Sequence, residues 1–436
     1  MFPISNDSFD AAVERLSILD VDNATIRQIC SLAGELEKEA GQPMVHLEIG
    51  NPGLEAEAIG VKAEIEVLAS GIANQYPPIT GIPQLKMAGS NFIKAFLDID
   101  IAPKGIVPTV GSMQAAFTLQ LLLSQRVKGK NKMLYLNPGF PAHFTQTRTL
   151  DIPSVEFDIY SYRGEALEAK LESVLSKGDI SGILYNNPNN PAWTNLTDTE
   201  LEIIGRLATK YDCIVLEDLA YFGMDFRTDI SQPGVPPFGS TVARYTDNYI
   251  LLLSASKIFS YAGQRIALVC ISDKLYCRKF DALKQRYNMP AFGDAYIFGI
   301  LYCASSGTAH SAQFAFAAML QAATNGDLKF IEHCSEYGRR ASIVKPMFTR
   351  NGFNIVYDMD GDQPIADGFF FTIGYPGMSG AVLQKELMKY GVSSISLKTT
   401  GSVQEGIRGC VSMISSPDDF ARLESYLQAF HRDHPF

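Results

Sequence analysis

Short apolar runs alternate with longer amphipathic segments between residues 113 and 271. Runs of about five residues predict buried strands at Lys132–Leu136, Ser154–Phe157, Gly182–Tyr185, Cys213–Glu217, Tyr249–Leu253 and Arg265–Ile271. Apolar residues at helical spacing predict helices at Met113–Gln125, Glu165–Leu175 and Asp198–Tyr211. Strands that are apolar along their length and separated by helices indicate an α/β fold, with a mostly parallel sheet sandwiched by helices.

The pattern changes at about residue 329, and the chain beyond it is expected to form a smaller α+β domain. A helix containing Arg339 and Arg340 leads into predicted strands and helices at Asn354–Asp358, Gly368–Ile373, Ala381–Tyr390, Arg408–Ser412 and Pro417–His431. Further helices are expected at Asn23–Ala40 and Ser305–Ala323. We expect a large domain over residues 46–325 and a small domain formed by residues 1–45 together with 326–436.

The composition of the 436 residues excludes several classes of function. The 37 lysines and arginines against 47 acidic residues give a net charge of −10, which disfavours binding to nucleic acid or to an anionic membrane. The longest apolar run, near Ala295–Ala304, is too short to span a bilayer. The seven cysteines form no C-x-x-C pair and the six histidines lack metal-ligand spacing, so we expect no metal site. Because the N-terminus also lacks a signal peptide, we expect a cytoplasmic protein.

Two strand-end loops carry side chains suited to catalysis. The strand ending at Leu253 runs into a polar loop with Lys257, whose amine can form a Schiff base with a carbonyl compound when it is desolvated. Ser254 and Arg265 flank this lysine and can hold a phosphate. Another strand ends near Asp218, whose carboxylate stays ionised beside a cation such as a pyridinium nitrogen. Taken alone, the lysine indicates a surface charge and the aspartate a helix cap.

Two further loops supply side-chain amides and a helix start. Asn187–Pro191 follows an apolar strand, and its amides can bond a ligand oxygen, although such a cluster alone indicates a turn. Gly111, Ser112 and Met113 open a helix whose free N–H groups and positive dipole end suit a phosphate. The chain contains neither a P-loop nor the G-x-G-x-x-G fingerprint of dinucleotide-binding proteins.

The order and spacing of these four segments resemble one family, the fold type I pyridoxal-phosphate-dependent aminotransferases of class I and II. The resemblance runs from about Leu47 to Arg408 and includes the S-x-S-K-x₅-G-x-R, D-x-x-Y and N-P-x-N-P signatures. It implies that Lys257 holds pyridoxal 5'-phosphate as a Schiff base and that Asp218 pairs with the pyridinium nitrogen. The other cofactor ligands that the resemblance implies are Gly111, Ser112, Met113, Asn190, Tyr221, Ser254 and Arg265.

Softer matches extend the implied site toward the substrate and toward a second subunit. Phe140 matches the residue on the face of the cofactor ring, and Gly50 matches a glycine near the substrate carboxylate. Arg408 matches the arginine that binds the substrate α-carboxylate, where Asn190 also lies; a surface arginine is the alternative. Tyr76 matches a tyrosine that reaches the neighbouring subunit's phosphate, which implies a homodimer with shared active sites.

The chain departs from the family pattern on the substrate side. Ala192 and Trp193 replace the Thr-Gly that often follows N-P-x-N-P, and Ser396–Ser402 replaces a Pro-Gly-x-x-Phe-Gly stretch. Trp193, the single tryptophan, is expected either in the core or in the pocket wall. No second arginine for a dicarboxylic substrate can be assigned, since Arg286 matches no motif. The amino donor and acceptor therefore stay open.

The resemblance implies an aminotransferase that moves an amino group between an amino acid and a 2-keto acid by a ping-pong mechanism. Lyases on the same fold, such as C–S lyases, decarboxylases or aminocyclopropane-carboxylate synthases, are an alternative. Release of ammonia with pyruvate would distinguish a lyase from an aminotransferase. A non-enzymatic sensor domain that binds the cofactor is a remote alternative, because only about 46 residues precede the loop at Gly50 and they are not basic.

Overall fold

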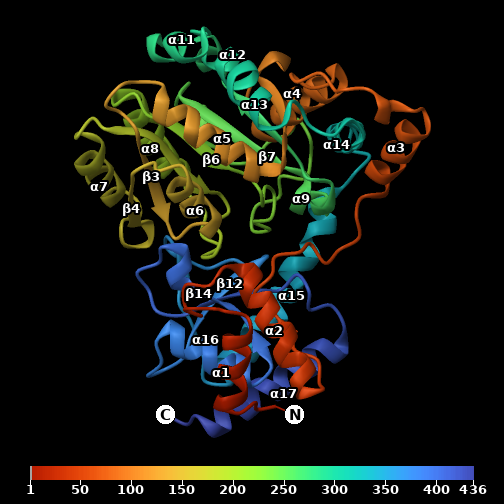
Figure 1. Ribbon diagram of the computed structural model, residues 1–436, viewed down its shortest axis with the longest axis vertical. Coiled ribbons are helices and arrows are strands. Elements are labelled where there is room, and N and C mark those ends of the chain that lie inside the picture. Colours follow the sequence, from red (N-terminus) through yellow and green to blue (C-terminus); the bar gives the residue numbers. More distant parts are fainter. Residues whose placement is uncertain (1) are drawn as a thin grey trace.

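The computed structural model describes residues 2–436, and a seven-stranded sheet forms the centre of its upper part (Figure 1). The strand order is β2-β8-β7-β6-β5-β3-β4, and only β8 is antiparallel to its neighbours. The strands are β2 Ile106–Val110, β3 Lys132–Asn137, β4 Ser154–Asp158, β5 Ile180–Asn186, β6 Ile214–Asp218, β7 Tyr249–Ser254 and β8 Ile266–Ile271. The predicted α/β fold with a mostly parallel sheet is confirmed.

Helices cover both faces of this sheet. Alternate side chains of a strand point to opposite faces, so on β7 Leu251 and Leu253 join one apolar core while Ile250 and Leu252 join another. Figure 1 shows α5 in front of the sheet, with α7 and α8 at one side. The helices of this part are α3 Ala58–Ala69, α4 Pro83–Leu97, α5 Gly111–Gln125, α6 Pro141–Thr149, α7 Ala166–Leu175, α8 Asp198–Lys210, α9 Ala255–Ile258, α10 Asp273–Cys277, α11 Asp281–Tyr287, α12 Phe292–Asp294, α13 Tyr302–Ser305 and α14 His310–Thr324.

A smaller antiparallel sheet lies in the lower part of Figure 1, in the order β14-β15-β12-β9. Its strands are β9 Asn354–Ile355, β12 Phe370–Gly374, β14 Ile395–Ser396 and β15 Ile407–Cys410, and a separate hairpin joins β10 Met359–Asp360 to β11 Gln363–Pro364. The helices around it are α15 Phe330–Arg350, α16 Gly380–Lys389 and α17 Pro417–Asp433. This second sheet is the predicted smaller α+β part.

The N-terminal helices α1 (Asn6–Arg15) and α2 (Ile26–Ala40) pack in the lower part as well. Leu32 of α2 shares an apolar cluster with Met388 and Ile395, and β1 (Val45–His46) pairs in parallel with β13 (Val392–Ser393). Segments from both ends of the chain thus lie side by side. The domain limits at residues 45/46 and 325/326 stay a prediction.

Two predicted elements differ in detail. The strand expected at Arg265–Ile271 is present as β8 and runs antiparallel to its neighbours. The sequence could not predict this direction, because the apolar pattern of a buried strand is the same for both directions. The helix expected at Ser305–Ala323 begins five residues later, as α14, because the preceding turn contains Gly307, whose φ of 133° is incompatible with a right-handed helix.

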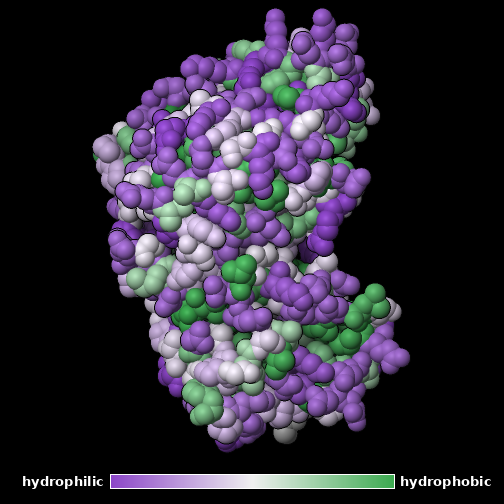
Figure 2. Space-filling view, turned by 90° about the vertical axis from the view of Figure 1, so that its left-hand side faces the viewer, coloured by the Kyte–Doolittle hydropathy of each residue, from purple (hydrophilic) through white to green (hydrophobic). Residues whose placement is uncertain are grey.

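The carboxyl ends of the parallel strands face the lower part of the molecule, as the arrowhead of β3 shows in Figure 1. Ligands of open α/β sheets bind beyond this edge. In Figure 2, hydrophilic residues predominate on the visible face, and the outline narrows between the upper and lower parts. Within residues 2–436, every helix is too short or too polar to cross a membrane.

Candidate active site

A cavity of about 490 Å³ lies beyond the carboxyl ends of β5, β6 and β7. Nine of the predicted site residues line it: Ser112, Met113, Phe140, Asn190, Asp218, Tyr221, Ser254, Lys257 and Arg265. Gly111 lies at its edge, where a Cβ atom would come within 2.6 Å of Arg265 Nη2. The structure therefore brings the four strand-end segments together around one space.

Lys257 lies in the one-turn helix α9, directly after β7. Its amine projects into the cavity and donates a hydrogen bond to the carbonyl oxygen of Gly50. Desolvation lowers the pKa of this amine to about 8. A lowered pKa increases the fraction of neutral, nucleophilic amine near neutral pH, which Schiff-base chemistry requires.

Asp218 is the last residue of β6 and is buried. Its carboxylate accepts hydrogen bonds from Asn186 Nδ2 at 2.7 Å and from the backbone N–H of Ala220 at 3.1 Å, while burial raises its pKa to about 7. His143 Nε2 lies 3.9 Å from Oδ2, but burial lowers the pKa of His143 to about 4, so this ring is neutral at pH 7. Within residues 2–436, Asp218 thus contacts no cation, and a cationic ligand would favour its ionised form.

Asn187, Asn189 and Asn190 of the Asn-Pro loop make different contacts. Asn187 Oδ1 accepts the N–H of Leu196 at 3.1 Å, and Asn189 donates to the carbonyl of Pro138 at 2.8 Å, so both side chains hold the loop itself. Asn190 instead faces the cavity, where Nδ2 donates to the Tyr221 hydroxyl at 3.3 Å. This leaves Asn190 and Tyr221 next to each other as hydrogen-bonding groups for a ligand.

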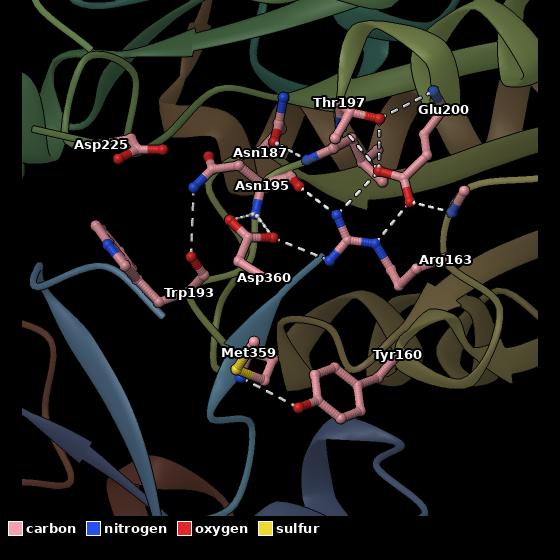
Figure 3. A network of polar contacts seen from close by, with 12 residues as sticks. Tyr160, Arg163, Asn187, Trp193, Asn195, Thr197, Glu200, Asp225, Met359 and Asp360 are labelled. Carbon is pink, nitrogen blue, oxygen red and sulfur yellow. Dashed lines mark hydrogen bonds and ion pairs between the residues drawn. The ribbon is translucent and has the colours of Figure 1, made fainter. Parts of the chain in front are cut away.

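A network of charged residues ties the segment after this loop to the hairpin of β10 and β11 (Figure 3). The backbone N–H of Asn195 donates to the carboxylate of Asp360 in β10 at 3.1 Å. Arg163 lies between two acids, with Nη1 2.9 Å from Asp360 Oδ1 and Nε 2.6 Å from Glu200 Oε1. Arg227 Nη2 also contacts Asp360, at 2.6 Å. Arg163, Arg227 and Asp360 do not line the cavity, so the network holds the segment after the loop from outside it.

Trp193 belongs to the core behind the cavity. Its side chain is fully buried, its ring centroid lies 5.6 Å from that of Tyr221, and it is not among the residues that line the cavity. Its backbone is left-handed, with φ of 65°, which is uncommon for a large side chain. Of the two positions considered for this tryptophan, the structure shows the core.

The part of the cavity beside Gly111 and Arg265 suits an anion. Helix α5 begins at Gly111, whose φ of 68° and missing side chain let the Arg265 guanidinium approach the helix start. Ser112 and Ser254 line the same end. Free N–H groups, hydroxyls and a guanidinium together form a cradle for a phosphate.

An adjoining cavity of about 500 Å³ contains two of the three remaining predicted residues, Gly50 and Arg408. Arg408 projects from β15 and is buried, and its Nη1 donates to Asn190 Oδ1 at 3.2 Å while Nη2 donates to the carbonyl of Glu48. Its Nε has no partner within residues 2–436. Burial lowers the pKa of this guanidinium, but an arginine stays charged at neutral pH. A buried arginine with a free N–H fits an anionic ligand such as a carboxylate.

Two residues considered in the sequence lie elsewhere. Tyr76 is 91% exposed and lines neither cavity, and Arg286 in α11 also lines neither. Asn186, in contrast, was missed, although it contacts Asp218. The sequence shows only that Asn186 directly precedes the Asn-Pro motif, because its register with Asp218 on the next strand follows from the sheet order.

The fold and the cavities define an α/β protein whose ligand site lies at the carboxyl edge of a covered sheet. The family model "Aminotransferase class I and II" matches residues 42–329, more than half of the chain. The chain therefore belongs to the class I and II aminotransferase family.

Named relatives support the same conclusion. The chain is 25% identical over 256 residues to a probable aspartate aminotransferase of Methanocaldococcus jannaschii, covering 59% of this chain and 62% of the relative. It is 26% identical over 260 residues to nicotianamine aminotransferase 1 of Oryza sativa, covering 58% of this chain and 50% of the relative. The matches thus span about half to three fifths of these relatives.

Solved structures share the fold over nearly the whole chain. Aspartate aminotransferase from Thermus thermophilus with maleate superposes with a TM-score of 0.72 at 19% identity, covering 96% of this chain and 98% of that one. An aminotransferase from Mycobacterium tuberculosis gives a TM-score of 0.75 at 16% identity, covering 94% and 96%. At these identities the likeness establishes the fold alone.

Proposed function

We propose that the chain is a pyridoxal-phosphate-dependent aminotransferase, which moves an amino group between an amino acid and a 2-keto acid by a ping-pong mechanism. One observation carries the proposal: an amine with a lowered pKa, a buried carboxylate that contacts no cation within residues 2–436, and a helix start beside an arginine line one cavity. These three features match the aldehyde, the pyridine nitrogen and the phosphate of the cofactor. Membership of the aminotransferase family supports the same function.

The residues of the first cavity fit this cofactor. Lys257 would bind its aldehyde carbon, Asp218 its pyridine nitrogen, and the hydroxyl of Tyr221 together with Asn190 its phenolic oxygen. Phe140 would lie against the ring. The phosphate would be held by Gly111, Ser112, Met113, Ser254 and Arg265.

When bound, pyridoxal phosphate accepts electron density from the substrate α-carbon and carries the amino group between the two half-reactions. Arg408 holds the substrate α-carboxylate, with Asn190 and Gly50 beside it. This anchor orients the substrate so that its α-proton lies within reach of the Lys257 amine. When the substrate's amino group displaces it from the cofactor, the neutral Lys257 amine would take the proton from the α-carbon as a general base and pass it to the cofactor's aldehyde carbon. Asp218 keeps the pyridine nitrogen protonated through its negative charge.

The test is a half-reaction with purified protein. After incubation with pyridoxal phosphate, we expect a visible Schiff-base absorbance, and an amino acid alone should convert it while one equivalent of keto acid forms. Adding a second keto acid should restore the absorbance. Continuous release of ammonia with pyruvate would instead indicate a lyase, and binding without conversion by any amino acid would indicate a sensor domain.

The proposal includes a homodimer in which Tyr76 reaches the partner's phosphate. Tyr76 is almost fully exposed, and several apolar side chains of the same upper part of the molecule are exposed too: Ile65, Leu68, Met87, Phe298 and Tyr302. Such exposure favours burial against another chain. Sedimentation should give twice the chain mass of 47.8 kDa. Tyr76→Phe should weaken binding of the cofactor through its phosphate group without changing the sedimenting mass. The cytoplasmic location stays a prediction.

A further inference from the structure

The second cavity combines a polar anchor with an apolar wall. Lys257 and Arg408 line it together with Asn190 and Tyr221. Eight of the fifteen other lining residues are apolar and come from segments far apart in the sequence: Ile26, Ile49, Met113, Phe117, Phe140, Pro141, Ala142 and Phe370. The others are Gly50, Arg27 and five neutral polar residues, Thr25, Asn51, Thr145, Gln146 and Thr149. A substrate bound through its carboxylate at Arg408 would place its side chain among these residues.

Helices α5 and α6 build much of this wall. Met113 and Phe117 are four residues apart on α5, and Ala142 and Thr145 are three apart on α6, so each pair shares one face of its helix. Gln146 Nε2 donates to the carbonyl of Met113 at 2.9 Å and ties α6 to α5. The wall is therefore a fixed surface that can distinguish side chains by shape and polarity.

Arg27 is the one further charged side chain that lines this cavity within residues 2–436. It lies in the first turn of α2, is exposed and makes no ion pair in that part of the chain. An ion pair between so exposed an arginine and a second substrate carboxylate would strengthen binding by no more than about fivefold. Each methylene buried against the wall strengthens it about threefold to fourfold. Three or four buried carbons therefore outweigh the ion pair.

We propose that this cavity selects amino acids with a large apolar side chain, aromatic or branched aliphatic, over the dicarboxylic amino acids. The proposal rests on the proposed function, because it takes Arg408 as the site of the α-carboxylate. Once Arg408 holds the α-carboxylate and Lys257 the cofactor, Arg27 is the one charged side chain of residues 2–436 left at this cavity. A second carboxylate would therefore lose water against the apolar wall without a buried cation of this chain to compensate. Thr145, exposed on the cavity face of α6, is a position that sets the size of side chain accepted.

The first test uses cofactor-loaded protein and carboxylates that lack an amino group. 3-Phenylpropanoate and 4-methylpentanoate carry an apolar side chain, whereas succinate and glutarate carry a second carboxylate. We expect the two apolar compounds to bind about tenfold or more tightly than the dicarboxylates in isothermal titration calorimetry. Conversion of the bound chromophore should follow the same order, with phenylalanine and leucine ahead of aspartate and glutamate.

The second test uses a pair of matched variants. Thr145→Trp fills the cavity from an exposed position, and Thr349→Trp makes the same change at an exposed position of α15 that does not line the cavity. Thr145→Trp should lower the ratio of phenylalanine to alanine conversion about tenfold, while Thr349→Trp should leave that ratio unchanged. An unchanged ratio in Thr145→Trp would contradict the assigned wall.

Binding of succinate or glutarate as tight as that of the apolar compounds would overturn the proposal. Arg27→Ala should change succinate binding by no more than about fivefold, and a larger loss would also overturn it. If no carboxylate binds and no amino acid converts the chromophore, the proposed function itself fails. That outcome is distinct from faster conversion of aspartate and glutamate than of phenylalanine and leucine, which would contradict the proposed substrate class alone.

Discussion

The two adjoining cavities differ in how their walls are built. The cavity beside Asp218 takes its polar groups from the ends of buried strands and from the short segments beside those ends, so the sheet fixes where each group lies. The cavity beside Arg408 gathers one or a few residues from each of α2, α5, α6, β12 and β15. The proposed chemistry therefore depends on rigid strand ends. The proposed substrate preference depends on residues of separate segments, which can be substituted without changing the strand ends.

The largest effect is expected from Asp218→Asn, which removes the negative charge from the cavity of the strand ends. Without that charge the pyridine nitrogen loses its proton, and turnover should fall at least about 100-fold. Steady-state kinetics with saturating cofactor measures the loss. Turnover within threefold of the wild type would contradict the role assigned to Asp218.

Although Asp218→Asn should lower turnover, it should raise the stability of the cofactor-free protein near neutral pH relative to the wild type. Burial raises the pKa of Asp218 from its ordinary value near 4 to about 7, so the folded state binds a proton that the unfolded state releases. This contribution to stability is full below pH 4 and is lost as the pH rises to 7. Asp218→Asn should flatten that decline, which thermal unfolding from pH 4 to 8 measures. Identical pH profiles for the two proteins would contradict the raised pKa.

A smaller effect is expected from Arg408→Lys, on the substrate side. Lysine keeps the charge but lacks the planar fork, so one charged hydrogen bond worth about 1.5–3 kcal/mol is lost. KM for the amino acid should rise roughly tenfold to 100-fold, while the visible absorbance of the bound cofactor is retained. Loss of that absorbance would place Arg408 in the cofactor site instead.

The smallest effect on turnover is expected from Asp360→Asn, behind the Asn-Pro loop. The change removes the charge shared by Arg163 and Arg227 and should lower the free energy of unfolding by about 1–3 kcal/mol. Because Asp360 lines neither of the two cavities, turnover should change less than about threefold. A tenfold loss of turnover at full cofactor occupancy would show that the network positions Asn190.

The contrast between the cavities also explains what the sequence could predict. The residues around Lys257 and Asp218 fall in short motifs at strand ends, so the cofactor side and the sheet could be predicted from local patterns and the family resemblance. Asn186 was missed because strand neighbours are set by the sheet order. The wall residue Phe117 carries no motif, and only the packing of α5 against α6 reveals it.

The most direct measurement is to reduce the cofactor-loaded protein with borohydride and to locate the attached group by peptide mass spectrometry. Lys86 is the other lysine to test as the attachment site, because burial lowers the pKa of its amine to about 8 as well. Its Nζ, however, donates a hydrogen bond to the Thr80 carbonyl at 2.8 Å. We expect the label on Lys257, its loss in Lys257→Ala and its retention in Lys86→Ala. Label on Lys86 or another lysine, with Lys257 unmodified, would contradict the convergence of the strand-end loops on one cofactor.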